Sequence, residues 1–137
     1  IDTLDYSDIP LAELLKQKKD GNPGFDFFTE NKVEIILFGE AKYIAKKNGY
    51  GKAFGQIVEF IDEGKDVSDF ASIDRFCSKN SLDNSDSGLK GYVAAFSSTN
   101  MTTDKLIRNI QSNSNFKKLT EHKEIICVAV DVILWMI

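Results

Sequence analysis

The sequence has little of several things that common functions require. Positive charge is not in excess, since the formal net charge is −4 at pH 7, so we expect no bulk electrostatic attraction to phosphate. Histidine occurs once, as His122, which gives little support to histidine nucleophiles or histidine metal sites. Cys77 and Cys127 lack metal-site spacing. We expect two buried free thiols in a reducing compartment rather than a disulfide.

No apolar run is long enough to span a membrane, which takes about 20 residues. The segment 125–137 is apolar but contains Asp131, so it predicts a buried strand. We therefore expect no membrane partner and a cytoplasmic location. The chain begins at Ile1 and ends in apolar residues, and we interpret it as a single domain, 1–137, from a larger protein with further domains or subunits.

Hydrophobic periodicity and turn residues predict an alternation of helices and strands. The predicted elements are a helix at 8–18, a strand at 25–29, a turn at 30–32, a strand at 33–43, a loop at 45–51, helices at 52–63 and 67–77, a loop at 78–90, a strand at 91–97, a helix at 103–111 and a buried strand at 124–134. This order predicts an α/β domain with a central mixed sheet flanked by helices.

Charged side chains interrupt the most apolar of the predicted strands. Because side chains alternate across a strand, Phe38, Glu40 and Lys42 share one face. A charge pair at the end of an apolar strand is costly unless it lies at a cleft or is paired. Asp26 is a second carboxylate in an apolar stretch, on the preceding strand.

A hairpin between the two strands would bring Asp26 close to Glu40. Two close carboxylates repel each other unless a cation lies between them, and Mg²⁺ prefers one or two carboxylates together with water and phosphate. Lys42 would stabilise charge on the phosphate or orient the attacking water. The pattern predicts a site for metal-assisted phosphodiester hydrolysis.

Asp26 followed by Glu40-Ala41-Lys42 resembles the motif of the PD-(D/E)xK nuclease superfamily, although Phe25 stands where the family has its proline. The resemblance implies a restriction endonuclease-like core and a Mg²⁺-dependent nuclease, with Mn²⁺ as a substitute, acting on DNA in restriction, defence or repair. It implies four metal ligands and two further active-site residues. The implied ligands are Asp26, Glu40, the Ala41 carbonyl and Glu13, with Lys42 as catalytic lysine and Gln56 on the following helix.

Lys46, Lys47 and Lys52 follow the motif strand. They predict either a positive rim that contacts the nucleic-acid backbone or a solvated loop. No motif for reading base sequence is present. Formation of a homodimer is a further possibility that the sequence leaves open.

Other interpretations also remain open. In one of them, Glu40 and Lys42 form a solvated ion pair on the surface. In another, Glu13 makes an ordinary helical contact with Lys16. A further alternative is that the domain has the nuclease fold but no activity, and serves as a binding or scaffold module. A different hydrolase or a protein-interaction domain would place Asp26 and Glu40 far apart.

Overall fold

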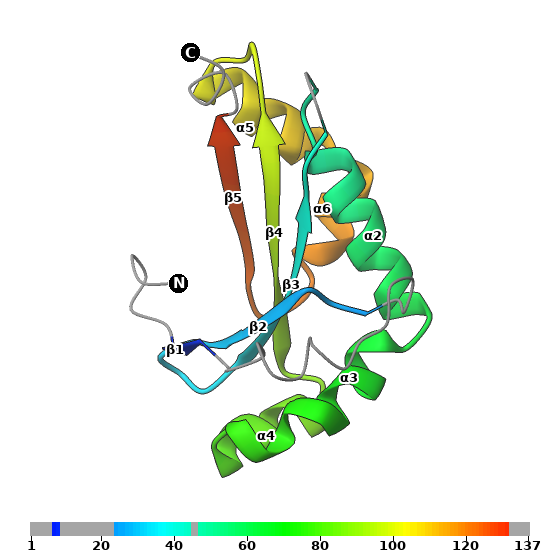
Figure 1. Cartoon of the computed structure of the whole chain (residues 1–137), viewed down its shortest axis with the longest axis vertical. Coiled ribbons are helices and arrows are strands. Elements are labelled where there is room, and N and C mark those ends of the chain that lie inside the picture. The colour runs from blue at the N-terminus through cyan, green and yellow to red at the C-terminus, as the bar shows by residue number, and fades with distance from the viewer. Residues whose placement is uncertain (1–6, 9–23, 45–46, 132–137) are drawn as a thin grey trace.

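The computed structural model describes residues 7–8, 24–44 and 47–131. They form an α/β fold in which a mixed sheet is flanked by helices (Figure 1). The elements in chain order are β1 (Ser7–Asp8), β2 (Phe27–Glu30), β3 (Ile36–Lys42), α2 (Tyr50–Asp62), α3 (Lys65–Ile73), the 3₁₀ helix η2 (Asp74–Phe76), α4 (Lys79–Asp86), β4 (Lys90–Ser98), α5 (Thr103–Ser112), α6 (Ser114–Leu119) and β5 (Ile125–Asp131). The predicted class is confirmed.

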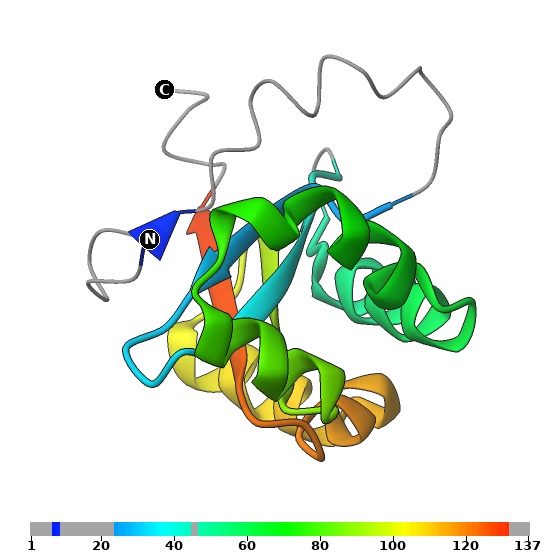
Figure 2. The same cartoon turned by 90° about the horizontal axis from the view of Figure 1, so that it is seen from below.

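The strands lie in the order β1-β2-β3-β4-β5. β1 and β2 form an antiparallel pair, as do β2 and β3, whereas β3, β4 and β5 run parallel. The helices α2 to α4 connect β3 to β4, and α5 and α6 connect β4 to β5. The carboxyl ends of the three parallel strands therefore lie at one edge of the sheet (Figure 1), while α3 and α4 gather at the opposite end (Figures 1 and 2).

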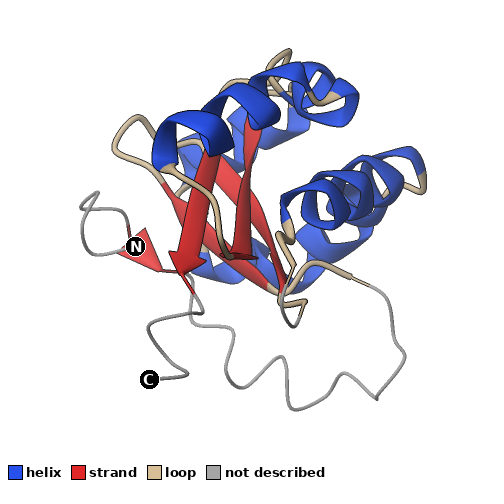
Figure 3. Cartoon of the chain, turned by 90° about the horizontal axis from the view of Figure 1, so that it is seen from above, coloured by secondary structure: helices blue, strands red, loops and turns tan. Residues whose placement is uncertain are grey.

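One face of the sheet carries the core. Ile36 and Phe38 of β3 lie on this face with Tyr92 and Phe96 of β4, and α2 packs against both strands (Figure 3). The buried residues of α2 follow helical spacing, as predicted: they are Ala53, Phe54, Ile57 and Phe60. Burial of each large side chain contributes roughly 1.5–3 kcal/mol. The alternation that buries Phe38 directs Glu40, two residues on, to the same face.

The turn between β2 and β3 is longer than the sequence predicts. Residues 33–35 were expected in the strand, but β3 begins at Ile36. The Asn31 side chain accepts hydrogen bonds from the backbone N–H groups of Val33 (3.0 Å) and Ile35 (2.9 Å). These bonds build a local turn that competes with the strand ladder. Glu34, with φ of 60°, adopts the left-handed conformation inside it.

Two helices were not predicted, and both are held by side-chain caps. The polar segment 78–90 was expected to be a loop, yet it contains α4, whose buried residues are only serines. Ser78 accepts from the Ser81 N–H and donates to the Glu34 carboxylate at 2.7 Å. α6 follows α5 almost directly, with Asn113 as its N-cap. In α4, capping and contacts with the β2–β3 turn therefore replace the apolar periodicity that marks other helices, whereas α6 packs against α2.

The last strand differs from the prediction in burial. β5 lies at the edge of the described sheet, and Val128 and Val130 are 37% and 44% exposed. A strand with one neighbour buries less than a central strand of equal hydrophobicity.

Both cysteines are free and half-buried rather than buried, and burial raises the pKa of Cys77 to about 12 and of Cys127 to about 11.

The helix predicted at 8–18 lies outside the described residues except for Asp8, which pairs in β1. No helix in the described parts of the chain is both long and apolar enough to cross a membrane.

Candidate active site

Strand pairing brings the two predicted carboxylates together. Phe27 of β2 pairs with Gly39 of β3, and one further step in this register places Asp26 opposite Glu40. Asp26 precedes β2, yet its N–H donates to the Gly39 carbonyl at 2.9 Å. Its Oδ2 atom accepts from the Ala41 N–H, also at 2.9 Å. Two backbone contacts with β3 thus fix Asp26 beside Glu40.

Gly39 permits this close approach of the strands. A Cβ atom at Gly39 would lie 2.2 Å from the ring of Phe27. The ring therefore occupies the space that a side chain would fill, in a cross-strand contact directly before Glu40. Sequence inspection offered no reason for this glycine beyond its place in the strand.

Glu40 is buried although it is charged at neutral pH in an ordinary setting. It is 3% exposed, and its Oε1 atom lies 3.3 Å from Nζ of Lys42. Its strand neighbour on β4 is Ala94, which is fully buried and offers no polar side chain. The Oε2 atom is buried and has no hydrogen-bond partner, the only such side-chain atom in the described part of the chain. Such an unsatisfied buried oxygen is costly, and a bound water molecule or ion would satisfy it.

The electrostatic setting of Glu40 agrees with its geometry. Burial raises the pKa of Glu40 to about 7, the charge of Asp26 adds to the rise, and Lys42 opposes it. A divalent cation between the two carboxylates would stabilise their charged forms and so lower the pKa of Glu40. The interpretation of Glu40 and Lys42 as a solvated surface pair does not fit, because only Lys42 is partly exposed, at 35% of its side chain.

The described residues supply two carboxylates to this site and no cluster of three or more metal-ligating side chains. Two carboxylates fit Mg²⁺, which usually keeps several waters and binds substrate phosphate. The orphaned Oε2 atom of Glu40 is the observation that favours a cation here. Glu13, the further ligand that the family resemblance implies, lies outside the described residues.

Within the described part of the chain, the structure gives the other predicted residues no defined contact with Glu40. Gln56 is half-buried on α2, the helix that packs against β3, but no hydrogen bond joins it to Glu40 in the described structure. Lys47 and Lys52 are exposed, whereas Lys46 is outside the described residues. His122 lies in the turn after α6, with its ring 4.9 Å from that of Tyr92.

Hydrogen bonds that the sequence did not predict hold the segment after β3. The Ile44 N–H donates to Oγ of Ser97 at 3.0 Å, and the Gly49 N–H donates to the Ser97 carbonyl at 2.8 Å. Asn48 exchanges two further bonds with the backbone of Thr99. The end of β4 therefore anchors the chain as it leaves Lys42. The sequence predicted only a loop at 45–51 for this segment.

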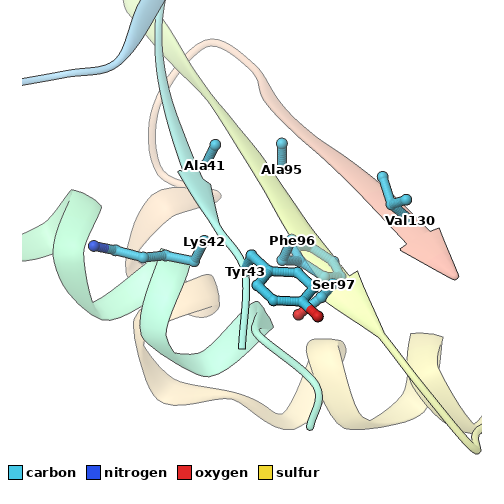
Figure 4. A pocket seen from close by; sticks show the side chains of 7 residues that line it. All are labelled: Ala41, Lys42, Tyr43, Ala95, Phe96, Ser97 and Val130. Atoms are coloured by element: carbon cyan, nitrogen blue, oxygen red, sulfur yellow. The ribbon is translucent and has the colours of Figure 1, made fainter. Parts of the chain in front are cut away.

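A pocket of about 330 Å³ adjoins the motif at the carboxyl ends of the parallel strands (Figure 4). Such edges are where open α/β sheets usually bind ligands. The lining is mainly apolar, with Lys42 and the 68% exposed Tyr43 on the motif side. The lining residues are Ala41, Lys42, Tyr43, Ala95, Phe96, Ser97 and Val130.

A second buried charged cluster lies at the opposite end of β4. Asp66 of α3 forms an ion pair with Lys90, and its Oδ2 atom accepts from the Tyr92 hydroxyl at 3.4 Å. Burial and the neighbouring Lys90 lower the pKa of His122. The cluster ties α3 to β4.

Comparison of the chain with models of protein families, with curated proteins and with solved structures finds no significant match. The functional argument therefore rests on the geometry of Asp26, Glu40 and Lys42.

Proposed function

We propose that this protein is a metal-dependent nuclease of the PD-(D/E)xK kind that hydrolyses phosphodiester bonds, with DNA as substrate. The observation that carries the proposal is the buried Glu40, whose Oε2 atom has no hydrogen-bond partner, next to the carboxylate of Asp26, which is bonded to the Ala41 N–H of the same strand. Lys42 on the same face supplies the third member of the motif.

The arrangement of elements supports the finer fold assignment, a restriction endonuclease-like core. Asp26 lies directly before β2, which pairs antiparallel with β3, the strand that carries Glu40; α2 and the parallel strand β4 follow. The family resemblance implies this order around its motif. Glu13 and the Ala41 carbonyl complete the proposed ligands.

In the proposed mechanism, Asp26 and Glu40 would hold Mg²⁺, for which Mn²⁺ would substitute. The bound ion would acidify a water molecule and neutralise phosphate charge. Lys42 offers its ammonium group to the phosphate or to the attacking water, while its pairing with Glu40 keeps that group at the site. Gln56 supports water or substrate from α2, and Lys46, Lys47 and Lys52 contact the phosphate backbone.

Cleavage of DNA with Mg²⁺ or Mn²⁺ tests the proposal. Asp26→Ala, Glu40→Ala and Lys42→Ala should each lower the rate about 10²–10³-fold, because the first two remove a proposed metal ligand and the third removes the positive charge that acts at the phosphate. Asp83→Ala on α4 and Lys118→Ala on α6 are matched controls at exposed positions and should cut at the parental rate. If the three site variants cut as fast as the controls, the proposal is wrong.

A second candidate is an inactive module that keeps this fold for binding or scaffolding. The net charge of −4 favours it, since an acidic protein attracts nucleic acid weakly. Calorimetry separates the two: the nuclease predicts a heat of Mn²⁺ binding that disappears in Asp26→Asn. The adjacency of Asp26 and Glu40 opposes a third idea, a protein-interaction domain in which they lie far apart.

We place the nuclease in the cytoplasm, in defence or repair, working with further domains or as a homodimer. Cleavage assays of the protein with foreign and with damaged DNA would test this placement.

A further inference from the structure

A carboxylate from α3 holds the backbone just before Asp26. The N–H group of Phe25 donates to Oδ2 of Asp69 at 2.8 Å, although the two residues are 44 positions apart in the sequence. The bond lies outside the sheet ladder, because β2 begins at Phe27. A hydrogen bond to a charged acceptor is about twice as strong as a neutral one.

The Phe25 side chain is fixed as firmly as its backbone. It is fully buried, and its ring lies 5.2–5.9 Å from the rings of Phe38, Phe60 and Tyr92. With the ring in the core and the N–H on Asp69, Phe25 has little freedom to rotate. The next residue, Asp26, continues directly from this anchor into its own two bonds with β3.

The helix that carries Asp69 is itself anchored to the sheet. Asp66, one turn earlier on α3, is ion-paired with Lys90 and hydrogen-bonded to Tyr92 at the start of β4. Residues three apart lie on one side of a helix. α3 therefore uses two carboxylates, Asp66 to grip β4 and Asp69 to hold the chain before Asp26.

We propose that Asp69 is a positioning residue for the metal site: through the Phe25 N–H it sets where Asp26 presents its carboxylate to the ion. This inference rests on the proposed function, since it deepens the description of the same site. A purely structural role for Asp69 would change stability alone. A positioning role also changes metal affinity, because loss of an outer partner typically weakens metal binding 10–100-fold.

The test is calorimetric titration of the full chain with Mn²⁺ at pH 8. Asp69→Ala should raise the dissociation constant about 10–100-fold. Asp69→Asn should stay within about threefold of the parent, because its amide oxygen still accepts from the Phe25 N–H. Asp74→Ala, an exposed aspartate directly after α3, is the matched control and should bind as the parent does. Should Asp69→Ala fail to fold, Asp69→Leu gives a closer match in size without an acceptor.

The outcomes separate the inference from the proposed function. Parent and Asp69→Ala binding Mn²⁺ equally well would overturn the positioning role and leave the metal site standing. A parent that binds no Mn²⁺ would overturn both. Hydrogen exchange of the Phe25 amide gives a second readout: exchange should speed up at least tenfold in Asp69→Ala but not in Asp69→Asn, and equal exchange in all three proteins would also contradict the inference.

Discussion

Glu40 and Asp66 are two buried carboxylates, each paired with a lysine, and their surroundings differ in one respect. Asp66 is 4% exposed, and its Oδ2 atom accepts from both Lys90 and Tyr92. Glu40 is 3% exposed and contacts its lysine through Oε1, while Oε2 lacks a partner. A buried charge with its partners fixes a structure, whereas an unsatisfied one costs stability. Asp66 therefore stabilises the fold, whereas the setting of Glu40 fits the proposed role as a metal ligand.

Removal of Asp66 should have the largest effect on stability. Asp66→Ala leaves the half-buried Lys90 and the buried Tyr92 hydroxyl without their partner, so the free energy of unfolding should fall by about 2–4 kcal/mol. Urea unfolding measures the loss. Asp66→Leu with Lys90→Met removes both charges and should recover part of it. A loss in Asp66→Ala below about 1 kcal/mol would contradict the role assigned to this pair.

Without metal, the charged form of Glu40 should lower the stability of the protein, whereas Asp66 raises it. In the folded protein the pKa of Glu40 is about 7, above the usual 4.5. Between pH 4.5 and pH 7, the folded state therefore keeps a proton on Glu40 that the unfolded state has released. Stability therefore falls as pH rises from about 4.5 through 7, by up to about 3 kcal/mol. Glu40→Gln should abolish this fall and exceed the parent in stability at pH 8.

Urea unfolding with a chelator, at pH 5.5 and 8.5, measures this difference. Subtracting variant from parent removes the contribution of His122, whose lowered pKa acts with the opposite sign. Glu59→Gln, at an exposed position of α2, is the matched control and should follow the parent. An identical pH dependence in Glu40→Gln and the parent would show that Glu40 is not strained.

Gly39→Ala should disturb the Glu40 region through packing. The new methyl group would overlap the Phe27 ring, so the ring must move and the β2–β3 contact beside Asp26 shifts. We expect a loss of about 1–2 kcal/mol in unfolding free energy and weaker Mn²⁺ binding. Gly51→Ala on α2, where a Cβ meets nothing within 4 Å, should instead stabilise by about 0.5–1 kcal/mol. Equal melting temperatures for the two variants would contradict this account of the strand contact.

Gln56→Ala should have the smallest effect. Because Gln56 has no bond to Glu40 in the described structure, it should act only when substrate is bound. We expect cleavage about tenfold slower, or about 1.4 kcal/mol in transition-state stabilisation, with an unchanged melting temperature. Unchanged cleavage would remove Gln56 from the site and leave the rest of the account intact.

Local sequence patterns predicted the parts of the fold that depend on periodicity. Alternation in the motif strand placed Glu40 and Lys42 on one face, and helical spacing identified the buried side of α2. α4 was missed because its stability comes from the Ser78 cap and from Glu34 in a distant turn. The edge position of β5 was missed because hydrophobicity does not state how many neighbours a strand has.

In the candidate site, too, the sequence predicted the local contacts and missed those between distant segments. The hairpin argument anticipated the proximity of Asp26 and Glu40, since the two strands are adjacent in the chain. The bond from Phe25 to Asp69 and the role of Ser97 join segments far apart in sequence, and a single sequence carries no local signal for them. The orphaned oxygen of Glu40 depends on full tertiary packing, which no pattern of residues specifies.

The most direct test of the central claim is anomalous diffraction from crystals soaked in Mn²⁺ at pH 8. The account predicts one Mn²⁺ peak between Asp26 and Glu40, with oxygens of both residues among its ligands, including the oxygen of Glu40 that otherwise lacks a partner. No peak there, with Glu40 still paired only with Lys42, would contradict the proposed metal site and the nuclease built on it.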